Sequence, residues 1–371
     1  MDGDNLDRAV RLRHELHQHP ELACRERWTK GHLINFLKTN TALEIVDRGR
    51  WFYALYRAGA ERPKIAFRAD FDALPMDETI KLPYGSQCPG FAHKCGHDGH
   101  SAALAGFALE INRKGADKNI YFVFQHGEET GQGAAECAPL MDEEGIPEIF
   151  AFHNAPGLPR HAVSLKDGIA CCASTGMIIR LKGVPCHASR PEDGRNPAFA
   201  FAELVLGIPG LTAPGEYRGL VMATVIRVDL GEEAFGMSAA AGRLMLTVRG
   251  EYDDELERVI RRLEEKVREE AKRYGLEWDI GFCDTFPATV SHRESTAKVR
   301  RAAKELGLTL LEADKPSRGS EDFGWFTRRT GGAYFSVGCG ENHPAIHTAE
   351  YDFDDGIVPT VADIYMALVR A

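Results

Sequence analysis

The chain has 371 residues, of which 44% are hydrophobic and 27% are charged. This length predicts roughly two or three domains, and the composition is that of a globular protein with a sizeable core, which excludes disordered and fibrous classes. The formal net charge is −10 and no long basic block is present, so a nucleic-acid partner and an acidic membrane partner are not expected.

The N-terminal sequence and the cysteines indicate the cellular compartment in which the protein is expected. The first residues, MDGDNLDRAVRLRHEL, are acidic and polar, whereas a secretory signal is basic and then apolar. The sequence contains no unbroken run of about 18 apolar residues, the length needed to span a bilayer. The nine cysteines are irregularly spaced, which is typical of reduced thiols. We therefore expect a cytoplasmic protein without a membrane partner.

The first part of the chain alternates helical and strand patterns. Two helices separated by a break at Pro20 are expected over residues 5–38, and a helix ended by Gly115 is expected from residue 100. Short buried strands are expected at 64–69, 119–124 and 148–154. Strands separated by helices predict an α/β fold with a mixed, largely parallel sheet and helices on both faces.

The middle of the chain has a different pattern. Residues 175–183 and 240–250 alternate apolar and polar side chains, as in strands with one exposed face. Residues 253–275 have helical apolar spacing with a glycine stop. A strand at 331–338 returns to the first pattern. We predict a smaller α+β domain at 173–284, inserted into an α/β domain formed by 1–172 and 285–371.

Polar side chains follow successive predicted strands, where open parallel sheets bind their ligands. Such residues, together with those that precede a helix or follow the last strand, are Asp70, Asp72, His126, Glu128, Glu129, His153, Cys95, His97, His100 and His347. Each one alone is explained by packing, capping or solvation. Their shared position after successive strands predicts a common site.

The residue types in this set indicate metal binding. A nucleophilic cysteine needs one base and one orienting group, not several histidines and two acidic pairs. Thiolate, imidazole and carboxylate together suit zinc, cobalt, nickel or manganese. The number of donors exceeds one tetrahedral site, and two ions about 3.5 to 4 Å apart would account for the excess. We interpret Cys95 as a metal ligand.

With these residues identified, the chain resembles the M20 metallopeptidase and amidohydrolase family, in particular its branch of aminoacylases, hippurate hydrolases and auxin-conjugate hydrolases. The matching stretches run in order along nearly the whole chain: LHQHPEL (16–22), RADFDALPMDE (68–78), CGHDGHSA (95–102), GEETGQGA (127–134), FHNAPGLP (152–159), CHASRPEDGRNPA (186–198), SEDF (320–323) and HTAEYDFDD (347–355). The resemblance implies a zinc-exopeptidase-like catalytic domain with an inserted lid and dimerisation domain.

The resemblance also implies roles for individual residues. The metal ligands it implies are Cys95, His97, Glu129, His153 and His347. They would hold two divalent ions (zinc, manganese, cobalt or nickel), with Cys95 as the bridging ligand. Asp72 would orient a ligand, and Glu128 would be the general base and acid in the hydrolysis of an amide bond.

Two further residues lie in the predicted insert. His187 matches a family histidine that reaches across a dimer to stabilise the oxyanion; the alternative is a polar loop residue. Arg249 matches an arginine that can hold a substrate carboxylate, a task that suits a guanidinium, and an ordinary salt bridge is the alternative. A homodimer or higher homo-oligomer is implied.

The leading hypothesis is an N-acyl amino acid amidohydrolase acting on a small-molecule substrate. The alternatives are a metallo-dipeptidase, another deacylase of the N-acetyldiaminopimelate or aminobenzoyl-glutamate type, a cysteine hydrolase using Cys95, and a noncatalytic metal-dependent binding module. The chain departs from the family pattern at Ser189 to Pro191, where many relatives have a second histidine, and at FGMSAAAG (235–242). Both departures lie in the insert, which helps to shape the substrate pocket.

Overall fold

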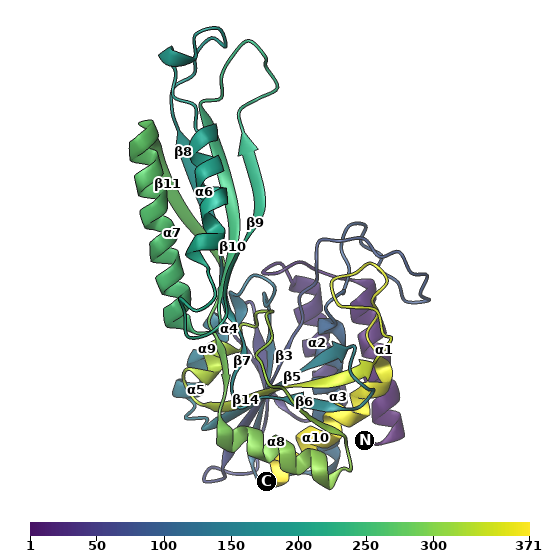
Figure 1. Cartoon of the computed structure of the whole chain (residues 1–371). Helices are drawn as coiled ribbons and strands as arrows, with labels where there is room; N and C mark the ends of the chain where they lie inside the picture. The colour runs from purple at the N-terminus through teal and green to yellow at the C-terminus, as the bar shows by residue number, and fades with distance from the viewer. The chain divides into compact units, whose positions relative to one another are not determined.

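The computed structural model describes residues 1–371, and the chain divides into two compact units. The first unit contains Met1–Ala170, Thr289–Pro316 and Asp322–Ala371, and the second contains Cys171–Ala288 and Ser317–Glu321. Both units can be followed along the chain in Figure 1.

An eight-stranded mixed sheet forms the centre of the first unit. Its strands lie in the order β1-β2-β4-β3-β5-β14-β6-β13. Their bounds are β1 Glu44–Asp47, β2 Phe52–Tyr56, β4 Asn119–Gln125, β3 Lys64–Asp70, β5 Glu148–Pro156, β14 Gly331–Gly340, β6 Val163–Leu165 and β13 Leu310–Glu312. The four central strands, β4, β3, β5 and β14, run parallel, as does the β6–β13 pair, whereas β1, β2 and β6 add antiparallel pairings. A separate two-stranded sheet pairs β7 (Gly168–Cys171) with β12 (Thr289–Ser291).

Helices cover both faces of the eight-stranded sheet. One apolar cluster joins the sheet to α1, α2, α3, α8 and α10, and a second joins the opposite face to α4, α5 and α9. The bounds are α1 Gly3–Gln18, α2 Arg27–Asn40, α3 His97–Lys114, α4 Gly133–Cys137, α5 Pro139–Glu143, α8 Arg293–Glu305, α9 Gly324–Thr327 and α10 Val358–Arg370, preceded by the 3₁₀ turn Asp355–Ile357. Burial on both faces explains why most residues of the central strands are apolar.

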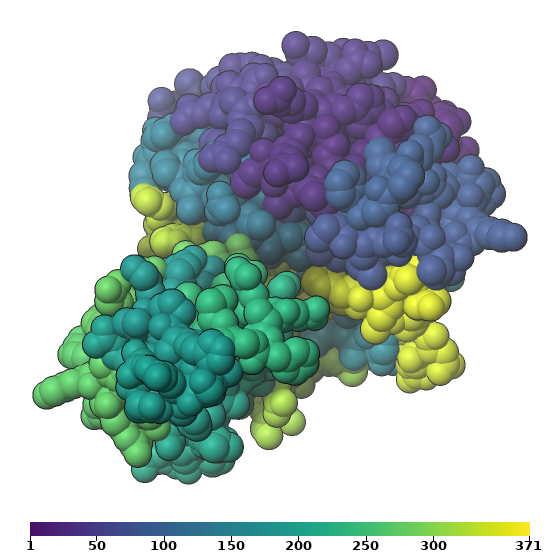
Figure 2. All heavy atoms as spheres, turned by 90° about the horizontal axis from the view of Figure 1, so that it is seen from above, coloured from purple at the N-terminus to yellow at the C-terminus, as the bar shows by residue number.

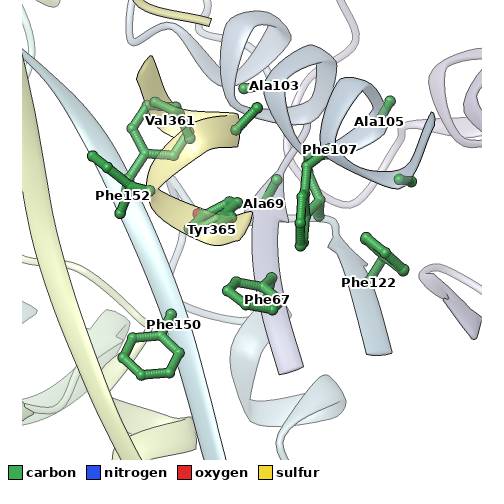
Figure 3. Packing of buried hydrophobic residues seen from close by; sticks show 14 of the residues in the cluster. Phe67, Ala69, Ala103, Ala105, Phe107, Phe122, Phe150, Phe152, Val361 and Tyr365 are labelled. Atoms are coloured by element: carbon green, nitrogen blue, oxygen red, sulfur yellow. The ribbon is translucent and has the colours of Figure 1, made fainter. Parts of the chain in front are cut away.

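Aromatic side chains fill the larger core cluster (Figure 3). The ring of Phe67 on β3 lies 4.9 Å from that of Phe107 on α3 and 4.6 Å from that of Tyr365 on α10, measured between centroids. Small residues on α3 let other elements approach closely: a Cβ on Gly106 would lie 3.0 Å from Cβ of Ala9 on α1. The core thus fixes α3, whose first residue is His97.

The second unit is a four-stranded antiparallel sheet with two helices. Its strands lie in the order β11-β8-β10-β9, with bounds β11 Glu277–Phe286, β8 Ala173–Lys182, β10 Ala241–Gly250 and β9 Val221–Leu230. The helices are α6 (Ala198–Leu211) and α7 (Asp253–Tyr274), and a 3₁₀ turn spans Pro191–Asp193. Atoms from early and late parts of this unit, teal and green, lie together on the surface in Figure 2.

The α7 helix shows how the sequence produces this layer. Its buried apolar residues include Leu256, Val259, Leu263 and Val267, at the spacing of one helical face. Gly275 ends the helix in the left-handed conformation, with φ of 64°. The predicted helix and its glycine stop are therefore observed.

The predicted fold class is confirmed: a mixed, largely parallel sheet with helices on both faces and a separate smaller antiparallel layer. The sequence reading missed the edge strands β1, β9 and β11, most of whose residues are not fully buried, and it missed the short buried strand β2. No helix combines the length and the apolar character needed to cross a bilayer.

Candidate metal centre

Cys95 and His97 reach the rim of the sheet through a tight turn at the start of α3. Gly96, between them, has a φ of 101°, and a Cβ at this position would lie 2.5 Å from Oδ1 of Asn154. Only glycine adopts this backbone without a clash. The turn brings the Cys95 thiol and a ring nitrogen of His97 within 4.8 Å of each other.

Asp72 connects His97 to the loop that follows β4. Its Oδ1 lies 3.0 Å from Nδ1 of His97, and its Oδ2 accepts a hydrogen bond of 2.9 Å from the backbone N–H of Glu129. The other ring nitrogen of His97, Nε2, lies 3.8 Å from Oε1 of Glu129 and 3.9 Å from Oε2 of Glu128. A carboxylate that holds one imidazole nitrogen leaves the second available to a metal ion.

Two more histidines approach Cys95 from other segments. Nε2 of His153 lies 3.4 Å from the Cys95 thiol. His153 directly follows the apolar segment EIFAF, and because β5 continues to Pro156 the residue lies inside the strand. His347 follows β14; its backbone N–H donates to the carbonyl of Lys94 at 2.7 Å, and its Nε2 lies 3.5 Å from Oε1 of Glu129.

Among the groups of neighbouring donor atoms, two share Cys95. Cys95, His97 and His153 make the first group, and Cys95, Glu129 and His347 make the second, with all donor atoms in each group within 4.8 Å of one another. Two donor groups joined by one thiol have the composition expected of a two-ion site with a bridging ligand.

Unpartnered buried atoms indicate that these residues fit a metal ion. Nε2 of His97 and Oε1 of Glu129 are buried and have no hydrogen-bond partner. Buried polar atoms without partners are costly, and a cation would satisfy both of these. Burial lowers the pKa of His153 well below its usual value, which keeps the imidazole neutral and able to ligate.

The same environment opposes a role for Cys95 as a free nucleophile. Burial and the nearby Glu129 carboxylate raise the pKa of the Cys95 thiol. A nucleophilic cysteine requires the opposite shift, toward the thiolate. A metal ion could supply the positive charge that a thiolate needs here.

Glu128 is held beside these donors by residues that the sequence reading did not select. Its Oε1 accepts a hydrogen bond of 3.4 Å from the backbone N–H of Asp322. The Asp322 carboxylate accepts hydrogen bonds from Arg68 at 2.7 Å and Gln125 at 2.8 Å. The sequence signal that could have found them is Arg68, a charged residue within the strand KIAFRAD that was expected to be buried, since an arginine is rarely fully buried without a partner.

Not every predicted rim residue joins the donor groups around Cys95. Nδ1 of His100 lies 2.6 Å from Oδ1 of Asp70, and its Nε2 lies 2.6 Å from Oδ1 of Asn154, so both ring nitrogens have partners. His126 belongs to none of these groups, and its nearest charged partner is Glu136, at 3.3 Å. The expectation that His126 would converge with the other residues was wrong, because its imidazole lies next to Glu136 on α4.

His187 and Arg249 belong to the second unit. The His187 side chain is exposed, with Nδ1 2.8 Å from Oγ of Ser189. Arg249, on β10, donates from Nη1 to Oγ of Ser320 at 2.7 Å and to the carbonyl of Arg318 at 3.0 Å. Both residues thus have contacts within their own unit.

Known proteins resemble the chain along its whole length. It is 27% identical to an N-acetylcysteine deacetylase of Bacillus subtilis over 378 residues, covering 97% of this chain and 95% of the relative. It is 28% identical to an N-acetyl-L-cysteine deacetylase of the same organism over 350 residues, covering 92% of this chain and 82% of the relative.

Solved structures share the fold. The structure of Bacillus subtilis YXEP, described as a dinuclear metal-binding peptidase from the M20 family, superposes with a TM-score of 0.82 at 24% identity, covering 99% of this chain and 98% of that one. An aminobenzoyl-glutamate utilization protein from Klebsiella pneumoniae superposes with a TM-score of 0.76 at 21% identity, covering 99% and 96%.

A match to a family model shows which family the chain belongs to. The model described as peptidase family M20/M25/M40 matches residues 66–371, which is well over half of the chain. The match confirms the predicted family and, with it, the prediction that the protein is an enzyme that catalyses hydrolysis. The chain belongs to peptidase family M20/M25/M40.

Proposed function

We propose that this enzyme hydrolyses the amide bond of N-acyl amino acids and that it uses two divalent ions. The observation that carries the proposal is the pair of donor groups that share Cys95. The ligands would be Cys95, His97, Glu129, His153 and His347. The description of YXEP as dinuclear supports the number of ions, and the two deacetylases named above support an N-acyl substrate.

The ions, when bound, would polarise the scissile carbonyl and make the attacking water more acidic. Zinc, manganese, cobalt and nickel all accept this mixture of sulfur, nitrogen and oxygen donors. The chain's own residues would provide orientation and proton transfer. Asp72 would hold His97 in the ring orientation and tautomer that leave Nε2 for the metal.

Glu128 would be the general base. Its carboxylate lies next to the donor atoms, and the backbone N–H of Asp322 fixes one of its oxygens. From there it would remove a proton from the attacking water and deliver it to the departing amine. Replacing a positioned base usually lowers the rate by about 10² to 10⁴.

His187 and Arg249 would act on the substrate. An imidazole N–H can stabilise the oxyanion that forms on the attacked carbonyl, and a guanidinium can bind the carboxylate of the amino acid product in a bidentate way. For His187 we propose action from the partner subunit of a homodimer. Its exposed side chain leaves the imidazole available for such a contact.

A substrate panel tests the proposal. Amine release would be measured from N-acetyl, N-benzoyl and longer N-acyl amino acids and from dipeptides, using enzyme stripped with a chelator and then resupplied with zinc, manganese or cobalt. We expect turnover of N-acyl amino acids that requires metal. Activity limited to dipeptides would change the substrate class, and turnover by fully stripped enzyme would contradict metal dependence.

The Glu128→Gln variant tests the base separately. The variant keeps the shape of the side chain and removes its ability to take a proton. We expect about 10² to 10⁴ lower kcat with metal binding unchanged. Wild-type kcat in Glu128→Gln enzyme that contains its full metal complement would assign the base to another residue.

A further inference from the structure

A cluster of fully buried charged side chains lies between α1 and the start of α3. Arg13 and His17 come from one face of α1, Lys94 precedes Cys95, and Asp98 follows His97; all four have exposures of 0%. Charged residues are rarely buried so completely, because their desolvation is costly unless every charge is paired. The proposed catalytic steps use none of these side chains.

His17 is placed between two carboxylates. Its Nδ1 lies 2.7 Å from Oδ2 of Asp98, and its Nε2 lies 2.9 Å from Oε1 of Glu78. Ionised carboxylates only accept hydrogen bonds, so both ring nitrogens must donate and the ring is an imidazolium cation. The neutral tautomers of histidine could satisfy one of these contacts but not both.

The pKa of His17 agrees with this geometry. Burial lowers the pKa, but the hydrogen bond and charge of Asp98 and the hydrogen bond of Glu78 outweigh burial and raise the pKa to about 9. The other groups near the ring are Arg13, Asp352, His93 and Tyr84. His17 is therefore a charged group at neutral pH.

The contacts of His17 extend to both sides of the Cys95–His97 turn. Asp98 directly follows His97. Glu78 also binds Nζ of Lys94, which directly precedes Cys95, and Nζ of Lys94 donates to the carbonyl of Tyr351 at 2.7 Å. The carbonyl of Lys94 accepts the backbone N–H of His347. One imidazolium thus joins the residues on either side of the turn to each other, and through Lys94 to the His347 segment.

We propose that His17 is a positioning residue that sets the geometry of the metal donors on the Cys95–His97 turn by holding Asp98 and Glu78 together. This inference rests on the proposed role of Cys95 and His97 as ligands. Without His17, Asp98 keeps only the 3.5 Å contact with Arg13, and Glu78 loses its connection to α1. The turn could then shift and separate the donor atoms.

Electrostatics and positioning predict opposite changes in metal affinity when His17 is replaced. His17 is a cation near a site proposed for two dications, so removing its charge would by Coulomb's law alone strengthen metal binding. A loss of affinity therefore reports lost positioning. Residues that orient metal ligands typically change affinity by about 10- to 100-fold when they are replaced.

The experiment measures cobalt binding to the full-length protein. Metal-free wild type, His17→Gln and His17→Phe would be titrated with Co²⁺ in competition with a chelator. The charge-transfer absorption band from the Cys95 thiolate to cobalt would be recorded for each protein. The matched control is Leu12→Ala, which destabilises the same helix by creating a cavity at a buried residue of the apolar core and removes no charged side chain. Circular dichroism would verify folding.

We expect both His17 variants to bind cobalt about 10- to 100-fold more weakly and to show an altered thiolate band, whereas Leu12→Ala keeps both wild-type values. Unchanged cobalt affinity in folded His17 variants would overturn the inference, as would an equal loss in Leu12→Ala. If wild type binds no cobalt, or if Cys95→Ser leaves the absorption band unchanged, the proposed metal centre itself fails, and this inference falls with it.

Discussion

At the scale of single residues, the Asp72 carboxylate contacts two of the proposed metal ligands. Its two oxygens fix the His97 ring and the backbone of Glu129, so one carboxylate orients two donors. Replacing it with asparagine keeps the shape but puts an N–H₂ group where one acceptor is needed. We expect Asp72→Asn to bind zinc about 10- to 100-fold more weakly, as measured by chelator competition.

Asp47→Asn serves as the control for this measurement. Asp47 is an exposed carboxylate whose partner is Lys30, at 2.7 Å on the surface. The same chemical change there should leave zinc affinity at the wild-type value. Equal affinities for all three proteins would show that Asp72 does not orient a ligand.

The residues around Cys95 could largely be selected from the sequence, because most of them follow a strand or begin a helix; His153 lies inside β5, close to its end. Glu128 and Asp72 were found by the same rule. Arg68, Asp322 and Asn154 were not, because their roles depend on pairing between segments far apart in the chain. His126 met the rule and still lies elsewhere, since position after a strand does not fix the direction of a side chain.

At the scale of elements, α1 and α3 are joined at both ends by buried polar groups. His17 meets Asp98 at one end; at the other, the fully buried Glu110 accepts hydrogen bonds from Asn5 at 2.7 Å and from the backbone N–H of Asp2 at 3.0 Å. Together these contacts fix the position of α1 along α3. The start of α3, which carries His97, is therefore held by the N-terminal helix as well as by the sheet.

Glu110 makes this junction sensitive to acid. Burial raises its pKa, but hydrogen bonds from Lys114 and Asn5 outweigh burial and lower the pKa from 4.5 to about 2. Because the folded-state pKa is lowered, the carboxylate contributes stability above pH 4.5 that is lost as the pH falls toward 2. We expect Glu110→Gln to lower the free energy of unfolding at pH 7 by about 1 to 3 kcal/mol.

Urea unfolding at several pH values measures this contribution. As the pH falls from 4.5 toward 2, the difference between wild type and Glu110→Gln should shrink, since the carboxyl group is protonated first in the unfolded chain and then in the folded protein. A constant difference from pH 7 to pH 3 would show that the charge of Glu110 is not what stabilises the junction.

Close packing at the first turn of α3 gives a second prediction for this element. A Cβ on Gly99 would lie 2.3 Å from the ring of Phe353. Gly99→Ala must displace that ring or the helix start, and overpacking of this kind costs about 1 to 3 kcal/mol. Thermal unfolding should show a lowered Tm.

Gly31→Ala is the matched control, because Gly31 is also a helical glycine and a Cβ there meets no atom within 4 Å. Alanine should raise stability at that position by up to about 1 kcal/mol. A Tm that rises in both variants would mean that Phe353 moves aside without cost.

Elements of the fold were predictable where burial was strong. The central strands and α7 have clear apolar patterns, and their ends were found to within a few residues. The outer strand β9 was missed although its sequence, VMATVIRVDL, is rich in β-branched residues. Strand pairing across a sheet is a long-range property that the local pattern of one strand does not encode.

At the scale of the whole molecule, the exposed edge of the second unit's sheet is a candidate dimer interface. β9 lies at this edge and exposes Val225, Ile226 and Val228, of which Ile226 is 58% exposed. An edge strand with exposed apolar side chains is prone to pair with another chain. We expect wild type to be a dimer by light scattering and Ile226→Lys to be a folded monomer.

The opposite edge provides a control. Phe282 on β11 is also an exposed apolar residue at a sheet edge, and Phe282→Lys should remain dimeric. Dissociation of Phe282→Lys, with Ile226→Lys intact, would place the interface at β11. A monomeric wild type would remove the basis for any role of His187 across subunits.

Complementation between two inactive variants separates action within a subunit from action across the dimer. Glu128→Gln and His187→Ala would each be purified, mixed, and allowed to exchange subunits. If His187 acts across the interface, a hybrid dimer has one active site in which both Glu128 and the His187 of the other chain are intact. Random exchange makes half of the dimers hybrid, so about a quarter of the wild-type rate should return. If His187 acts within its own chain, both sites of the hybrid remain defective and no activity returns. The Ile226→Lys background should abolish any recovery, because its subunits cannot pair.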